Sequence, residues 1–177
     1  MHLEKLNFRR LKMVYRRYLF WDFPASERRP IWKMRRLWKK GLYAAWVMAD
    51  EKGKILAYAA AAVLDGDVLL DYLAVVRGKR GSGCGTKMLE LLKEEFSGQT
   101  VFLEAEDPAD GDPTKRRRVD FYLRGGFADS GVRCNVYGVD FVILTNTALP
   151  SDEAKSRLDR LYRAVFVPKA YWKHIRF

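Results

Sequence analysis

Residues 75–96 read VVRGKRGSGCGTKMLELLKEEF, and this stretch is the most informative part of the sequence. An apolar strand leads into a loop with glycines at positions 78, 81, 83 and 85, and an amphipathic helix follows at once. Glycine tolerates positive φ and has no Cβ, so the backbone N–H groups of such a loop can approach a ligand closely. The helix start adds unpaired N–H donors and the positive end of the helix dipole. Together these features predict an anion site, most often one for phosphate.

Two familiar phosphate motifs do not fit the spacing of this loop. A Walker A loop ends in Gly-Lys-Ser/Thr, whereas Lys87 follows Thr86 and precedes Met88. A Rossmann fingerprint needs Gly-x-Gly-x-x-Gly, and neither register of the loop places a glycine at the third position. The pattern that remains is Arg-x-x-Gly-x-Gly at residues 80–85, with Leu-Ala-Val at residues 73–75 upstream.

A second motif follows downstream, Phe-Tyr-Leu-Arg-Gly-Gly-Phe at residues 121–127, and a strand at 100–106 lies between the two. The loop resembles the acetyl-coenzyme A loop of the GNAT superfamily of N-acetyltransferases. The second motif resembles the Phe-Tyr-x-x-x-Gly-Phe segment that ends the fourth helix of many of these enzymes. Either motif alone has little specificity, and both in this order are far more specific. Lys115 lies near the position where the family usually carries an asparagine.

The resemblance implies an α/β fold in which helices flank a mixed central sheet. We expect a single acetyltransferase domain over residues 1–177, because this length holds one full core. Its parts would be basic N-terminal helices at about 1–41, a cofactor-binding core at about 42–145, and a C-terminal helix with an aromatic tail at about 150–177. Apolar residues make up 49% of the chain, which is typical of a globular protein.

Hydrophobic spacing and turn residues predict the individual elements. Helices are expected at residues 8–19, from Ser26 to about 40, from the glycine loop to about 96, at about 114–124, and from Ser151 onward. Strands are expected at about 42–50, 54–64, 68–76, 100–106, 127–135 and 139–145. The four alanines at 59–62 favour a helix by propensity. The close turns on both sides and the family order favour a strand.

Composition narrows the class of protein further. The longest apolar run, residues 55–64, is too short to span a bilayer, and the charged N-terminus does not resemble a signal peptide. Cys84 and Cys134 form neither a disulfide framework nor a metal set. A Cys84–histidine nucleophile pair is not favoured, because the two histidines lie near the chain ends. We therefore expect a cytoplasmic protein without a metal site or membrane segment, either a monomer or a homodimer.

The net charge of +11 is concentrated at one end of the chain. Residues 1–41 hold 13 basic and 3 acidic residues, a net charge of +10, and the remaining residues carry only +1. A basic patch attracts polyanions such as nucleic acid, or acidic small molecules. The alternative is a solvated helical face, since no zinc-finger or RNP pattern accompanies the charge.

The resemblance implies acetyl-CoA as a cosubstrate. Backbone amides of residues 80–86 would hold its pyrophosphate, and residues 73–75 would pair with the pantetheine arm as an added strand does. An amide there, that of Val75 in first place, would polarise the thioester carbonyl. The expected cofactor contacts are Leu73, Ala74, Val75, Arg80, Gly81, Ser82, Gly83, Cys84, Gly85 and Thr86.

Three residues are candidates for the chemistry. Tyr122 is the candidate general acid, because a phenol with a pKa near about 10 can donate a proton to a leaving thiolate. Glu104 and then Asp71 are candidate bases for the attacking amine, since strand alternation places acidic side chains on one face. The alternatives are a core tyrosine, carboxylates in ion pairs with arginines, and a water chain in place of a base.

The leading functional hypothesis is N-acetylation of a primary amine on a small molecule or protein, by direct attack in a ternary complex. Acidic residues near the cofactor and basic helices beside them would suit a substrate with both a positive amine and a negative group. Three rivals remain open. They are an aminoacyl-tRNA acetyltransferase, a non-catalytic acyl-CoA-binding sensor, and a nucleic-acid-binding module.

Overall fold

The computed structural model describes residues 1–25 and 27–177. The strands are β1 (His2–Lys5), β2 (Tyr43–Ala49), β3 (Ile55–Leu64), β4 (Asp67–Val75), β5 (Thr100–Glu106), β6 (Ala128–Val136), β7 (Val139–Thr145) and β8 (Ile175–Arg176). The α-helices are α1 (Phe8–Val14), α2 (Phe20–Asp22), α3 (Ile31–Lys39), α4 (Cys84–Glu95), α5 (Pro113–Arg124), α6 (Ser151–Val165) and α7 (Pro168–His174). A π-helical turn η1 (Tyr15–Leu19) and a 3₁₀ turn η2 (Pro108–Asp110) complete the described elements.

The strands follow the order β1-β2-β3-β4-β5-β7-β6-β8. β4 and β5 pair in parallel, and the other described ladders are antiparallel, so the sheet is mixed. This confirms the predicted α/β fold with a mixed sheet flanked by helices. The chain forms two compact units, Met1–Val63 with Asp71–Ser97 and Leu64–Leu70 with Gly98–Phe177. The strand β4 contributes its first residues to the second unit and its last residues to the first.

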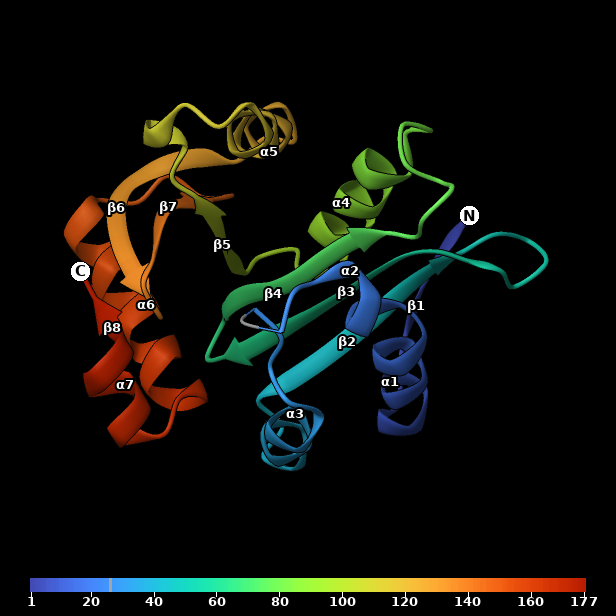
Figure 1. Cartoon of the computed structure of the whole chain (residues 1–177), viewed down its shortest axis with the longest axis horizontal. Helices are drawn as coiled ribbons and strands as arrows, with labels where there is room; N and C mark the ends of the chain where they lie inside the picture. The colour runs from blue at the N-terminus through green and yellow to red at the C-terminus, as the bar shows by residue number, and fades with distance from the viewer. Residues whose placement is uncertain (26) are drawn as a thin grey trace. The chain divides into compact units, whose positions relative to one another are not determined.

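In the first unit, helices cover both faces of the strands β1–β3. Figure 1 shows α4 on one face, and α1, α2 and α3 on the other. The ring of Trp46 on β2 packs 5.0 Å from that of Phe96 at the end of α4. Every residue of β2 is buried, as are the first eight of β3. Strands covered on both faces show no polar alternation, which explains why the alanines of β3 form a buried strand.

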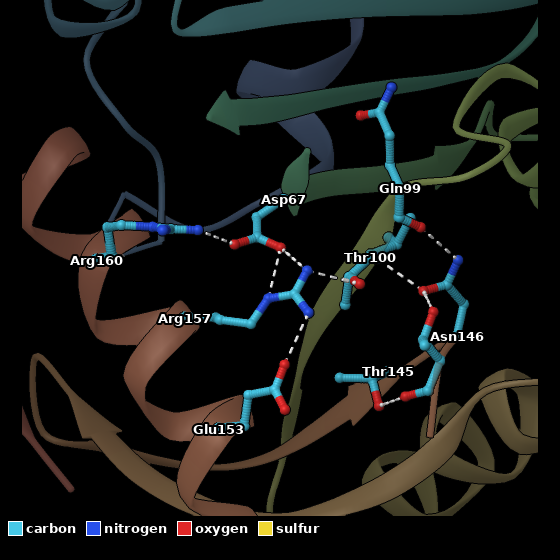
Figure 2. Close-up of polar contacts among 10 residues, drawn as sticks. Asp67, Gln99, Thr100, Thr145, Asn146, Glu153, Arg157 and Arg160 are labelled. Atoms are coloured by element: carbon cyan, nitrogen blue, oxygen red, sulfur yellow. Dashed lines mark hydrogen bonds and ion pairs between the residues drawn. The ribbon is translucent and has the colours of Figure 1, made fainter. Parts of the chain in front are cut away.

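In the second unit, α6 is fastened to the start of β4 by a buried carboxylate. The side chain of Asp67 has no exposed surface, and Figure 2 shows Arg157 and Arg160 of α6 pointing at it. Arg157 Nε lies 2.9 Å from Asp67 Oδ1, and Arg160 donates to Oδ2 at 2.6 Å. The Arg157 guanidinium also donates to Thr100 Oγ1 at 2.9 Å, which joins α6 to β5.

Asn146 binds backbone groups at the start of β5. The Asn146 side chain accepts from the Val101 backbone N–H at 2.7 Å and donates to the Gln99 carbonyl at 3.2 Å (Figure 2). Backbone groups at the start of β5 are thereby satisfied where the regular ladder stops.

Several element boundaries differ from the sequence predictions. β1 was not predicted, because four residues with two charges give too short a pattern. The first helix continues through η1 to Asp22, and α3 begins at Ile31 after Pro30 instead of near 26. The predicted cap Ser26 lies outside the described residues. The tail docks on its own chain, since Tyr171 of α7 is buried and Ile175 of β8 pairs with β6.

Candidate active site

The glycine loop follows the end of β4 at Val75, five residues after β4 leaves its ladder with β5 at Leu70. That ladder covers Asp67–Leu70, and residues 73–75 at the end of β4 are half-buried. Gly78, Gly81 and Gly83 have φ values of 81°, 77° and 78°. A Cβ placed on any of the three would meet no atom within 4 Å. Glycine is therefore required by the left-handed backbone and not by crowding, and open space remains beside the loop.

Gly83 is also the N-cap residue of α4, and no side chain caps this helix. The first helical hydrogen bond runs from the Lys87 N–H to the Gly83 carbonyl at 3.0 Å. The N–H groups of the first turn are donors for an external acceptor, which with the helix dipole suits a phosphate group. The expected contact residues 84–86 belong to this first helical turn instead of the loop.

Cys84 is the first residue of α4. Its side chain is buried at the start of α4. The Ser82 hydroxyl lies 3.2 Å from Cys84 Sγ and donates to the Lys79 carbonyl at 2.6 Å. The Ser82 side chain therefore stabilises the loop, and the backbone of this segment remains available to a ligand.

Arg80 and Arg77 tie the loop to the end of α2. Both guanidinium groups lie 3.3 Å from Asp22 Oδ1, whose carboxylate is 4% exposed, and Tyr58 donates to Oδ2 at 3.0 Å. Arg80 Nε also lies 3.5 Å from the Val75 carbonyl. The Arg80 side chain remains 62% exposed, so it can face an anion while Asp22 fixes its position.

Asp71 lies in the first unit, within a buried ion pair. Arg29 donates to Asp71 Oδ2 through Nε at 2.9 Å and to Oδ1 through a terminal nitrogen at 3.1 Å. Tyr43 donates to Oδ2 at 2.6 Å. Burial, followed by the Asp71 charge, raises the pKa of Tyr43 well above its usual value. This is the ion pair with an arginine that the sequence left open as an alternative to a base.

Glu104 lies in the second unit, half-buried on β5. The hydroxyl of Tyr162, a fully buried residue of α6, donates to Glu104 Oε1 and lies 3.5 Å from Cys134 Sγ. Burial, followed by the Glu104 charge, raises the pKa of Tyr162 far above its usual value. Burial also raises the pKa of Cys134 to about 12. Tyr162 therefore stays protonated and able to donate to Glu104 at neutral pH.

Tyr122 lies in the second unit on α5, which begins at Pro113 after the N-cap Asp112. The Tyr122 side chain is buried against Phe121 and Phe127, with ring centroids at 5.2 and 6.2 Å. Burial raises its pKa, an effect that Arg118 partly offsets. A buried phenol that keeps its proton has the state that a general acid needs.

An acidic cavity of about 390 Å³ lies beside α5 in the second unit. Its lining includes Glu106, Asp107, Asp110 and Asp140, together with Lys115. Lys115 is ion-paired with Asp110, which raises the pKa of this lysine and lowers that of the aspartate. The lysine that stands in place of the family's asparagine thus has a carboxylate partner.

The candidate residues divide between the units. The loop residues 73–86 and Asp71 belong to the first unit, and Tyr122 and Glu104 to the second. Sequence reasoning missed Arg29, Tyr43 and Tyr162, the partners of the two carboxylates. Tyr162 lies on the buried stripe of α6 with Leu158 and Leu161, and this helical spacing is the signal that could have identified it as a buried residue. The partnership between Arg29 and Asp71 had no local signal, because 42 positions separate them.

A sequence model described as the acetyltransferase (GNAT) family matches residues 9–127, which is more than half of the chain. The chain therefore belongs to the GNAT acetyltransferase family and is an acyltransferase. No curated protein matches the chain.

Solved structures share the fold at low sequence identity. A GNAT-family acetyltransferase structure from Bacteroides thetaiotaomicron has a TM-score of 0.78 at 19% identity, covering 92% of this chain and 96% of that one. A spermidine N-acetyltransferase chimera from Vibrio cholerae and hSSAT has a TM-score of 0.62 at 12% identity, covering 86% and 98%. An aminoglycoside 6'-N-acetyltransferase complexed with coenzyme A has a TM-score of 0.56 at 15% identity, covering 85% and 98%. At these identities the likeness shows the fold alone.

Among the residues that the structure describes, no helix has the length and apolar character needed to cross a bilayer.

Proposed function

We propose that this enzyme moves an acetyl group from acetyl-CoA to a primary amine of a small molecule or protein, by direct attack in a ternary complex. The observation that carries the proposal is the loop between β4 and α4. Its glycines at 78, 81 and 83 hold left-handed backbone with open space beside them, and no side chain caps α4. This arrangement fits the pyrophosphate of coenzyme A, and a similar fold has been solved as a coenzyme A complex.

The glycine loop and the end of β4 each have a proposed task in holding the cosubstrate. Backbone N–H groups of residues 80–86 bind the pyrophosphate, and Arg80 adds a positive charge that Asp22 holds in place. Residues 73–75, half-buried after β4 leaves the β5 ladder, pair with the pantetheine arm. The Val75 amide is the proposed donor to the thioester carbonyl, whose oxygen gains negative charge during attack.

The proposed reaction uses one acid and one base. The amine nitrogen attacks the thioester carbonyl carbon, a C–N bond forms and the C–S bond breaks. Glu104 accepts the proton that the amine loses, and Tyr122 donates its proton to the leaving thiolate. We assign the base to Glu104 before Asp71, because protonation of Asp71 would disrupt its bidentate bond with Arg29.

The amine class to test first is a cationic one. Solved proteins of similar fold are named for spermidine and for aminoglycosides, which are polyamines. The acidic residues around β5 and η2 suit attraction of such a cation. A screen of amines for release of free thiol from acetyl-CoA tests this choice of acceptor.

Thermal unfolding with and without acetyl-CoA tests the cosubstrate. At 100 times its dissociation constant, a ligand that binds only the folded state stabilises by about 2.7 kcal/mol, or roughly 5 to 10 °C for a chain of this size. Gly83→Trp should abolish this shift by filling the space beside the loop. Gly53→Trp is the matched control, because Gly53 also has positive φ, 74°, with nothing within 4 Å of a Cβ. Both variants lose a left-handed glycine, and only one blocks the loop.

A wild-type protein whose melting temperature does not respond to saturating acetyl-CoA would overturn the proposal. A shift that survives Gly83→Trp would place the cosubstrate elsewhere. Release of free thiol from acetyl-CoA is then measured against a panel of polyamines, aminoglycosides and peptides. Binding without thiol release from any amine would favour an acyl-CoA-binding sensor.

A further inference from the structure

The first helical segment carries a stripe of exposed cations. Arg9, Lys12 and Arg16 follow one another at helical spacing along α1 and η1, and Arg17 lies beside them. All four side chains are exposed, whereas Leu11 and Val14 on the opposite face are buried. The segment is therefore basic on the outside and fully packed on the inside.

The helix α3 repeats this pattern. Arg35, Arg36 and Lys39 are exposed, Lys40 follows at the C-cap, and Met34 and Leu37 are buried. The two helical segments contact each other, since the rings of Phe8 and Trp38 lie 5.8 Å apart at an edge-to-face angle. Figure 1 shows α1 and α3 on the same face of the strands. We call these eight residues the cationic surface: Arg9, Lys12, Arg16, Arg17, Arg35, Arg36, Lys39 and Lys40.

The positive charge of the cationic surface is not compensated locally. Within the described residues of the first unit, none of the eight forms an ion pair. Glu4 pairs with Arg10, and Asp22 pairs with Arg77 and Arg80, none of which belongs to the cationic surface. Eight like charges held on two packed helices create a field that favours a polyanionic ligand.

Exposed aromatic rings lie on α3 and on α2, the short helix that follows η1. Trp21 on α2 is 64% exposed and Trp32 on α3 is 62% exposed. The Lys33 ammonium lies 5.5 Å from the centroid of the Trp32 ring. Flat rings among cations offer stacking platforms next to phosphate contacts, which is how proteins bind single-stranded nucleic acid.

We propose that the cationic surface, with Trp21 and Trp32, binds single-stranded nucleic acid. A membrane surface fits less well. An amphipathic helix that lies in a bilayer inserts a continuous apolar face, whereas Leu11 and Val14 of α1 and Leu37 of α3 are buried in the protein. This binding is a second activity, and it does not depend on the proposed acetyl transfer.

Fluorescence anisotropy with a labelled oligouridylate of about 20 nucleotides tests the proposal, because single-strand sites span roughly 4 to 16 nucleotides. Binding should weaken steadily between about 50 and 200 mM salt, as counterion release requires. Arg35→Glu/Arg36→Glu should lower affinity and reduce the slope of log affinity against log salt by about 1.4, since each contact to a single strand contributes about 0.7. Lys39→Glu/Lys40→Glu is a second variant with the same expectation, should the first not fold.

The matched control is Arg116→Glu/Arg117→Glu on α5. Both residues are exposed neighbouring arginines, so the net charge changes by the same amount at a different place. This control should retain wild-type binding and slope. Trp32→Ala should weaken binding about tenfold with an unchanged salt slope, because stacking does not depend on counterions.

Three results would overturn the proposal. One is the absence of binding to the oligonucleotide at about 50 mM salt, the low end of the range. Another is an equal loss of oligonucleotide affinity in the α3 and α5 charge variants, which would show that binding depends only on the net charge of the protein. The third is binding to phosphatidylglycerol vesicles in the absence of binding to the oligonucleotide. None of these measurements uses acetyl-CoA, so their failure leaves the proposed acetyl transfer untouched.

Discussion

Two strand carboxylates, Asp71 and Glu104, share the same residue chemistry and lie in different surroundings. Asp71 accepts hydrogen bonds from two guanidinium nitrogens of Arg29 and from the phenol of Tyr43. Glu104 accepts a hydrogen bond from the phenol of Tyr162. A carboxylate that shares both oxygens with an arginine must break that pair to accept a proton. A carboxylate with a phenol donor can accept a proton and keep its neighbour in place.

The different partners of Asp71 and Glu104 show that the position of a carboxylate on a strand does not by itself identify a catalytic base. Alternation along the strands made both carboxylates candidates, and only their partners separate them. The comparison assigns Asp71 to the stability of the first unit and Glu104 to the proposed chemistry of the second.

Glu104→Gln should lower kcat by about 10²- to 10⁴-fold, the usual contribution of a general base. The carboxamide keeps an oxygen for Tyr162, so the free energy of unfolding should change little. Thiol release with the best amine from the panel gives the rate, and urea unfolding gives the stability. A wild-type rate would show that a water chain, not Glu104, deprotonates the amine.

Asp71→Asn should destabilise the protein by about 3 to 5 kcal/mol, because it leaves the Arg29 charge buried without its partner. The Arg29 and Asp71 side chains are only 9% and 12% exposed. Replacing the pair by Arg29→Met/Asp71→Leu should recover much of that loss, since apolar side chains remove both charges. The midpoint of urea unfolding measures both changes.

The activity of Asp71→Asn provides the contrast with Glu104→Gln. The folded fraction should retain kcat within about tenfold, well below the contribution of a base. A larger loss of kcat with no loss of stability would reverse the assignment and make Asp71 the base.

Local patterns of the sequence predicted most of the fold. The glycine spacing at 78, 81 and 83 indicated the left-handed loop, because φ restrictions act residue by residue. The turns around 54–64 outweighed the helix propensity of the alanines. The strands near the ends of the chain were harder to predict, because β1 and β8 form only by pairing with distant strands. No local pattern indicates a strand of two to four residues.

The candidate site shows where such reasoning ends. A motif points directly to the residues that it contains, and so Tyr122 and the loop residues became candidates from the sequence alone. The side chains that set the state of a carboxylate come from other elements, as Arg29 and Tyr162 do. Their choice depends on packing at long sequence separation, which periodicity does not encode.

Tyr162→Phe and Tyr43→Phe form a matched pair, because each removes a phenol from one candidate carboxylate. Loss of a donor to a carboxylate favours the protonated form. Tyr162→Phe should therefore move the acidic limb of the pH–rate profile upward by about 0.4 to 1 pH unit, the equivalent of one hydrogen bond. Tyr43→Phe should leave that limb unchanged. The opposite pattern would return the base to Asp71.

The smallest predicted effect concerns stability at high pH. Burial raises the pKa of Tyr43 above that of a tyrosine in the unfolded chain, about 10. The folded state then keeps a proton that the unfolded state loses, so the free energy of unfolding falls as the pH rises above about 10. Each such tyrosine contributes at most about 1.4 kcal/mol per pH unit to that fall.

Removing one buried phenol should make that decline shallower by the contribution of one tyrosine. Urea unfolding between about pH 9 and 11 compares wild type with Tyr43→Phe, the range that brackets the ordinary tyrosine pKa. Tyr137→Phe is the control, because it removes the hydroxyl of a ring that is 46% exposed. An identical slope in all three proteins would mean that Tyr43 ionises as readily in the folded state as in the unfolded chain. The phenol would then not be held in the closed Asp71 cluster, and the contrast with Glu104 would lose its structural basis.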